Sequence, residues 1–218
     1  YGMNFSDLPW FKDALAGKFL NGKNGLTGTV MGAPERNDLV GKIYKDDGFV
    51  IPFSAQVKDM KGNLLGIWVN FADFGLIEHI IGQRREEMLK AGMDDPDLMI
   101  FDSKGVQLVD YDPQNLDAEG KLKHDFDTII LKKNFIDLGV EAAKLAAEGK
   151  EGFTIENNPD SNEINMFAYD QSVGAYDFPG TGWLIVMGAA PDDIYKIVNQ
   201  VKEHMLIVQA VLVGLSIL

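Results

Sequence analysis

The end of the chain constrains its fold more than any other stretch. Residues 204–218 (HMLIVQAVLVGLSIL) are almost wholly apolar and directly follow a charged, helix-like run from Asp192 to Glu203. A helix that spans a bilayer needs ~20 apolar residues, and this run stops short of that length. We therefore expect residues 192–218 to form an exit helix that runs into the start of a transmembrane segment. The alternative is a buried C-terminal core helix of a soluble protein, because shorter apolar runs are ambiguous by length alone.

Composition excludes several classes of protein. With 218 residues and 46% hydrophobic content, the chain can bury one sizeable core or two small ones. The formal net charge of -13 disfavours a nucleic-acid partner, which would need clustered Lys and Arg. Cysteine is absent, which removes disulfides, thiol nucleophiles and thiolate metal sites. No signal-like segment follows Tyr1, so we expect any signal or first membrane helix to lie upstream.

The first half of the chain carries a clear hairpin pattern. Residues Gly48 to Val57 and Leu64 to Ala72 are rich in strand formers and flank a short turn that contains Asp59 and Gly62. A shorter strand is expected from Asp38 to Tyr44, after a Gly-rich loop. Apolar residues then recur at helical spacing from Asp73 to Ala91, which predicts a connecting helix.

The second half has a similar order of elements. A second hairpin is expected around Asp102, Lys104 and Gly105. A helix is expected from Asn134 to Glu148, and another after Pro191, because proline suits the first turn of a helix. The expected strands are Leu98 to Phe101, Val106 to Tyr111, Glu151 to Glu156, Glu163 to Gln171 and Gly182 to Ala190. Strands in runs, with helices to one side, favour an antiparallel α+β sheet over alternating βαβ units.

The two halves end in the same order, as hairpin strands, a last strand and a helix that leaves the sheet. We therefore divide the chain into an N-terminally incomplete first module (1–75), a connecting helix (76–96), a second module (97–191) and the exit helix (192–218).

Several motifs resemble a known family. The runs Asp7 to Lys18 (DLPWFKDALAGK), Phe53 to Val57 (FSAQV) and Gly66 to Val69 (GIWV) look like the membrane-distal module of a double Cache sensor domain from a bacterial methyl-accepting chemotaxis protein. Ile100 to Gly105 (IFDSKG) and Gly182 to Val186 (GWLIV) resemble the opening and closing of its membrane-proximal module. The resemblance implies two PAS-like antiparallel-sheet modules with long helices. It also implies a homodimer in the bacterial inner membrane whose sensor domain faces the periplasm or the extracellular space.

The resemblance also bears on the ligand. Many members bind a small ligand in the distal module with a motif of the form Arg-x-Trp-Tyr-x-x-Ala. Here Trp10 and Ala14 match, whereas Leu8 replaces the arginine and Phe11 lacks the phenol hydroxyl. Leucine cannot form the bidentate hydrogen bonds that an arginine guanidinium makes with a ligand carboxylate, so ordinary amino-acid recognition is not expected. An amine or an organic acid is the expected class of ligand.

Five residues are candidates for ligand binding. Trp10 and Phe11 suit an apolar pocket lining, although plain core packing explains two aromatic residues equally well. The Tyr44 hydroxyl, Asn70 and Asp73 lie near strand ends, where they would contact a ligand, cap turns or face solvent. A carboxylate at position 73 would favour a ligand amine.

No catalytic or metal site is expected. Asp102 and Asp110 bracket a hairpin, where turn chemistry is the simpler explanation than a carboxylate pair. His79, His124 and His204 do not match the spacing of zinc ligands, and no phosphate-binding loop or nucleophile elbow occurs. We expect a protein that is not an enzyme and carries no cofactor.

The leading interpretation is the periplasmic, small-molecule-sensing part of a transmembrane chemoreceptor that transmits ligand occupancy through its membrane helix. One alternative is the same outer part of a histidine kinase or diguanylate cyclase. The other is a membrane-anchored adaptor whose modules bind another protein and no ligand.

Overall fold

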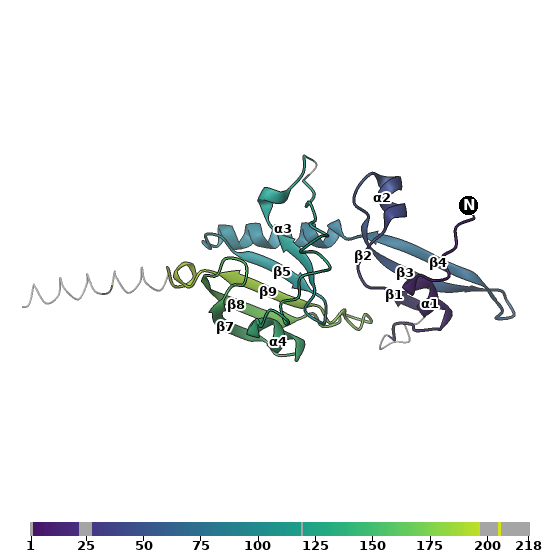
Figure 1. The fold of residues 1–218 in the computed structure, drawn as a ribbon. Helices are drawn as coiled ribbons and strands as arrows, with labels where there is room; N and C mark the ends of the chain where they lie inside the picture. Colours follow the sequence, from purple (N-terminus) through teal and green to yellow (C-terminus); the bar gives the residue numbers. More distant parts are fainter. Residues whose placement is uncertain (1, 22–27, 119, 197–204, 206–218) are drawn as a thin grey trace, which may run out of the picture.

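The part of the chain that the structure describes forms two antiparallel sheets with helices packed on them. The computed structural model describes residues 2–21, 28–118, 120–196 and 205 (Figure 1). Each sheet is assembled from strands that are mostly neighbours in sequence, and all their pairings are antiparallel. The expected α+β class with two antiparallel-sheet modules is confirmed.

The first sheet is built around one long hairpin. Its strands are β1 (Thr29–Met31), β2 (Glu35–Arg36), β3 (Phe49–Lys58) and β4 (Leu64–Asp73). Strand β3 pairs with β4 along its length, while β1 and β2 pair with successive parts of its other edge. In the turn, the Asp59 side chain accepts from the backbone N–H groups of Lys61 and Asn63, both at 2.8 Å, and Gly62 supplies a φ of 87°. The predicted hairpin is confirmed.

Helix α1 (Pro9–Leu15) covers one face of this sheet. The Ser54 hydroxyl of β3 donates to the Trp10 carbonyl at 3.0 Å, and the Gln56 amide donates to the Ala14 carbonyl at 2.8 Å. Trp10 and Ala14 are buried against the strands. These contacts attach a short helix, too short to be stable alone, to the sheet.

Residues Asp38 to Tyr44 form helix α2, so the predicted strand there is wrong. The Asn37 side chain caps the helix by accepting from the N–H groups of Leu39 and Val40, both at 3.2 Å. Lys45 ends it in the left-handed conformation, with a φ of 63°. The short apolar run satisfies the period of a strand as well as that of a helix, and the cap decides in favour of the helix.

Replacing Asn37 by alanine should lower the free energy of unfolding by about 1 kcal/mol, because two N–H groups of α2 lose their acceptor. Urea unfolding followed by circular dichroism measures the change. Asn37→Ser is the matched control, since serine retains a capping oxygen and should cost much less. Equal losses in both variants would show that the cap does not stabilise α2.

Helix α3 (Gly75–Lys90) connects the two sheets, as predicted. It follows β4 directly and lies beside strand β5 (Asp97–Phe101) of the second sheet (Figure 1). It also packs against the neighbouring strand β6 (Gln107–Tyr111). Gly82 lies against Tyr111, and a Cβ atom at this glycine would approach the tyrosine oxygen to 2.4 Å. The small residue therefore permits the close approach of α3 to β6.

The second sheet has the strand order β6-β5-β9-β8-β7. Its remaining strands are β7 (Gly152–Asn157), β8 (Ile164–Gln171) and β9 (Leu184–Ala189), with the 3-10 helix η1 (Pro113–Asn115) after β6. The predicted strands are confirmed. The helix expected from Asn134 to Glu148 begins only at Glu141, as α4 (Glu141–Ala147). The Asn134 side chain folds the preceding backbone into a turn, and Gly139 has a φ of 90°.

Two hydrophobic cores stabilise this arrangement. One lies between α4 and the second sheet, where the Phe101 and Phe135 rings are 4.6 Å apart. The other joins the two sheets, because Phe49 of β3 packs in the same cluster as Ile100 of β5 and Leu108 of β6. This shared core holds the segment that follows β6 close to the first sheet.

The predicted transmembrane start at residues 204–218 lies outside the described residues, apart from Met205. Residues 191–196 are helical, as expected after Pro191. Among the residues that the structure describes, no helix combines the length and apolar character needed to cross a membrane. The division of the chain at residues 75, 96 and 191 stays a prediction.

Candidate functional site

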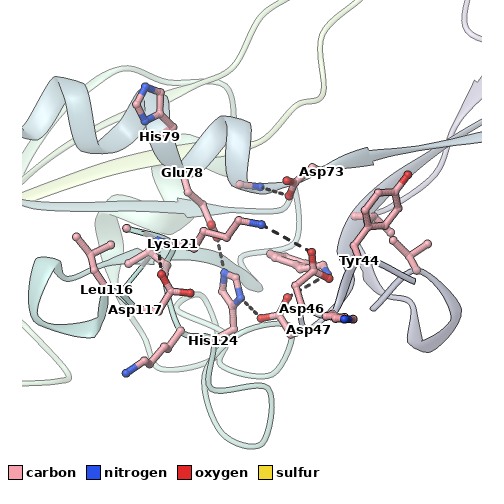
Figure 2. A pocket seen from close by; sticks show the side chains of 18 of the residues that line it. Tyr44, Asp46, Asp47, Asp73, Glu78, His79, Leu116, Asp117, Lys121 and His124 are labelled. Atoms are coloured by element: carbon pink, nitrogen blue, oxygen red, sulfur yellow. Dashed lines mark hydrogen bonds and ion pairs between the residues drawn. The ribbon is translucent and has the colours of Figure 1, made fainter. Parts of the chain in front are cut away.

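A cavity of about 840 Å³ lies where the two sheets meet. Ligand sites for small molecules commonly have volumes of roughly 300–1,000 Å³. The first module lines the cavity with two groups of residues: Val40 and Tyr44 to Asp47 from α2 and the loop after it, and Phe49, Val50, Phe71 and Asp73 from the β3–β4 hairpin. Helix α3 contributes Gly75, Glu78 and His79. Strand β6 and the loop after it contribute Tyr111, Leu116, Asp117 and residues 120–124. Both modules therefore contribute walls to one cavity (Figure 2).

Part of the cavity lining is apolar and comes from the first sheet. Val50 of β3 and Val40 of α2 are buried, and Phe71 of β4 is half-buried. Phe71 also contacts Trp10 of α1, with the ring centroids 6.0 Å apart and the planes nearly perpendicular. Edge-to-face packing of this kind stabilises both rings. Trp10 therefore supports the cavity from behind Phe71.

Charged side chains gather around the rest of the cavity. The lining includes the carboxylates of Asp46, Asp47, Asp73, Glu78 and Asp117 and the ammonium groups of Lys45, Lys121 and Lys123. The Lys121 ammonium lies 3.7 Å from the Asp46 carboxylate and so links the two modules. Asp73 accepts from the N–H of Gly75 at 2.9 Å, which fixes the carboxylate where β4 gives way to α3. Asp46, Asp47 and Glu78 are paired with Lys121 or His124, which leaves Asp73 as a carboxylate that can meet a cationic group of a ligand.

The loop residues 120–124, which form the cavity wall next to the second sheet, are held by a histidine that lies between two carboxylates. The His124 Nδ1 atom lies 2.5 Å from the Asp47 carboxylate, and its Nε2 atom lies 2.5 Å from the Glu78 carboxylate (Figure 2). Only 8% of the His124 side chain and 6% of the Glu78 side chain are exposed. Ionised carboxylates only accept hydrogen bonds, so contacts of this kind on both sides require both ring nitrogens to donate, as they do in an imidazolium.

Electrostatics favours this charge state. Burial alone would lower the pKa of His124, but its hydrogen bonds to Asp47 and Glu78 outweigh that effect and raise the pKa to about 9. For Asp47, burial raises the pKa, while the hydrogen bond and charge of His124 lower it by more, so the pKa lies below its ordinary value. The group is thus a buried cation with two partners.

The structure places the predicted ligand-binding residues differently with respect to the cavity. Tyr44 and Asp73 line it, and the Tyr44 side chain is largely exposed. Trp10 lies behind Phe71, and Phe11 packs against Trp10 with ring centroids 5.9 Å apart. Asn70 accepts from the Trp68 indole N–H at 3.1 Å and does not line the cavity. Tyr44 and Asp73 are therefore the two that a ligand in this cavity would meet.

The sequence did not predict the His124 bridge. His124 is 77 residues from Asp47 and 46 from Glu78, and no short motif connects them. From the sequence, His124 was a candidate only for a zinc ligand. Within the described ranges, no three His, Asp or Glu side chains are grouped so as to hold a metal ion. Asp102 accepts from the N–H groups of Lys104 and Val106, as turn chemistry predicts.

No known family model and no curated protein sequence matches the chain. Several solved structures match its fold. The periplasmic sensory domain of the Campylobacter jejuni chemoreceptor Tlp1 matches 88% of this chain with a TM-score of 0.56 and 18% identity. The extracellular domain mmHK1S-Z3, assigned to a histidine kinase, matches 91% with a TM-score of 0.55 and 13% identity. The ligand-binding domain of the Pseudomonas aeruginosa PAO1 amino acid chemoreceptor PctC, in complex with GABA, matches 87% with a TM-score of 0.50 and 14% identity.

The chain spans 57%, 59% and 64% of the lengths of these three structures. At such low identity the likeness concerns the fold. The chain has the fold of periplasmic and extracellular sensory domains, which is the Cache-type sensor fold that its motifs predicted.

Proposed function

We propose that this chain is the periplasmic ligand-sensing part of a transmembrane chemoreceptor of the bacterial inner membrane. The observation that carries the proposal is the cavity of about 840 Å³, which has an apolar side and a charged side and is lined by both modules. A ligand in such a place contacts both sheets at once. It can therefore favour one arrangement of the modules over another, which is what a signal requires.

Asp73 is the proposed anchor for the ligand, which would be a small molecule with an amino or other cationic group. The carboxylate lines the cavity, and its hydrogen bond to the Gly75 N–H holds it in place. Tyr44 would contact the ligand from the rim, with Trp10 and Phe11 supporting the apolar side. Asn70 would act only indirectly, through the β3–β4 hairpin, since it lies outside the lining.

Transmission would run from the cavity through the second sheet and the helical residues 191–196 toward residues 204–218, which we propose to be the start of a transmembrane segment. In a homodimer, a small displacement of these exit helices would be the output. The fold shared with mmHK1S-Z3 favours a second candidate, in which the same outer part controls a histidine kinase. An assay of the output domain in the whole protein would separate the two.

Calorimetry against a panel of amines, organic acids and amino acids tests the proposal. Asp73→Asn should weaken binding of the best amine about 10- to 100-fold, because a charge-assisted hydrogen bond contributes about 1.5–3 kcal/mol. The asparagine oxygen can still accept from the Gly75 N–H, so the fold should be retained.

Asp170→Asn is the matched control, since Asp170 is an exposed carboxylate on β8 that does not line the cavity. Its affinity should equal that of the wild type. Equal affinity in Asp73→Asn would remove Asp73 from the site. Silence of the wild type across the whole panel would instead favour an adaptor that binds a protein.

A further inference from the structure

His124 connects three separate parts of the molecule. Asp47 belongs to the loop between α2 and β3, Glu78 belongs to the start of α3, and His124 belongs to the loop that follows η1. Residues 120–124 of that loop line the cavity. The bridge therefore joins the lining residues 120–124 to the α2–β3 loop through Asp47 and to α3 through Glu78 (Figure 2).

The His124 and Glu78 side chains of the bridge are buried, whereas 34% of the Asp47 side chain is exposed. The His124 ring packs against Phe49 and Phe126, with centroid distances of 5.1 and 5.3 Å. In such surroundings an unpaired charge is costly, whereas a cation between two carboxylates is well satisfied. A neutral imidazole carries only one N–H, so loss of the proton would leave one carboxylate facing a bare nitrogen.

Other charged groups lie around this bridge, among them Lys45, Asp73, Asp117 and Lys123 of the cavity lining. The Arg36 guanidinium of β2 lies 5.3 Å from the centre of the Phe126 ring and acts electrostatically on Asp47. On the loop itself, Lys121 pairs with Asp46. His79 of α3 is an exposed neighbour of Glu78 and is bonded to Gln83. Asp47 and Glu78 are thus the two groups that hold the His124 proton directly.

We infer that His124 is a positioning residue which, as an imidazolium, holds residues 120–124 against the α2–β3 loop and α3 and so fixes one wall of the cavity; we call this contact the pin. The pin depends on the proton of a single buried side chain. If the proposed function holds, ligand affinity will follow the same proton, because a ligand that needs this wall binds better when the wall is fixed.

The pKa of His124, measured by NMR titration of the imidazole, provides the first test. Its signal is assigned by its absence in His124→Gln. Glu78→Gln and Asp47→Asn keep an oxygen that accepts from the ring and remove only the charge, so both variants should fold and both should lower the pKa of His124. His79→Gln is the matched control and should leave it unchanged. A His124 pKa at its ordinary value of 6.5, or one that Glu78→Gln leaves unchanged, would overturn the inference.

Amide hydrogen exchange at neutral pH provides the second test and needs no ligand. The Lys121 N–H donates to the Asp117 carboxylate and the Lys123 N–H donates to the Asn115 carbonyl, so both amides report on the loop. Glu78→Gln should speed their exchange about tenfold, because a neutral hydrogen bond replaces a charged one and local opening becomes easier.

In His79→Gln, the exchange of these two amides should match the wild type. Unchanged exchange in Glu78→Gln would show that the wall is held by its other contacts and would refute the pin. This result is independent of ligand binding, so it separates failure of the pin from failure of the proposed function.

Discussion

Replacing Phe74 by alanine should lower the free energy of unfolding by about 3–5 kcal/mol, the usual cost of removing a fully buried phenylalanine. The Phe74 side chain is 0% exposed. Its ring lies 4.2 Å from that of Phe49 and 5.9 Å from that of Trp183, measured between centroids. It thus fills the core that both sheets share, at the point where β4 turns into α3. Urea unfolding, followed by circular dichroism and tryptophan fluorescence, measures the change.

Phe153→Ala is the matched control, because it removes the same side chain from a position on β7 that is 65% exposed. It should change the free energy of unfolding by less than about 1 kcal/mol. If the shared core couples the sheets, Phe74→Ala should also separate the unfolding transition into two steps. A loss no larger than that of Phe153→Ala would show that Phe74 does not hold the sheets together.

Local chemistry explains which parts of the fold the sequence could predict. Both hairpins follow from turns in which an aspartate, Asp59 or Asp102, accepts from N–H groups within four residues of itself. Helix α2 was missed because its decisive cap, at Asn37, lies just before a short run with no distinct period. Strands β1 and β2 have three and two residues and are strands only because they pair with β3. Segments this short have no local sequence pattern that predicts a strand.

For the cavity too, only the lining residues that depend on local sequence could be predicted. Asp73 lines it because β4 ends there, whereas Asn70 is three residues earlier and so points to the other face of the strand. That difference follows from the alternation of side chains along a strand and was open to prediction. The wall at 120–124 was not, since it depends on a core formed between residues far apart in sequence.

Raising the pH from 7 to 9 should lower the free energy of unfolding by about 2 kcal/mol through His124 alone. Burial opposes the charge of this ring, but the hydrogen bonds to Asp47 and Glu78 prevail and raise the pKa to about 9, from 6.5 in the unfolded chain. The folded state therefore holds the proton more tightly. The resulting stabilisation is complete below pH ~6.5 and is lost as the pH rises through the folded pKa.

At acidic pH, protonation of Asp47 should also lower the free energy of unfolding. Burial raises the pKa of this carboxyl, but the bond to His124 lowers it by more, so the pKa lies below the ordinary 3.8. The contribution of Asp47 to stability is present above that ordinary value and is lost as the pH falls through its folded pKa. The bridge should therefore be complete at neutral pH and weaken on both sides.

Urea unfolding at a series of pH values measures this profile, and the difference between wild type and His124→Gln isolates the bridge from other titrating groups. That difference should shrink from pH 7 to pH 9, while His79→Gln should follow the wild type throughout. Glu78→Gln offers a milder perturbation if His124→Gln folds poorly, and it should reduce the alkaline loss without abolishing it. A constant difference between wild type and both bridge variants across this range would mean that His124 is neutral when buried, and the imidazolium pin would have to be abandoned.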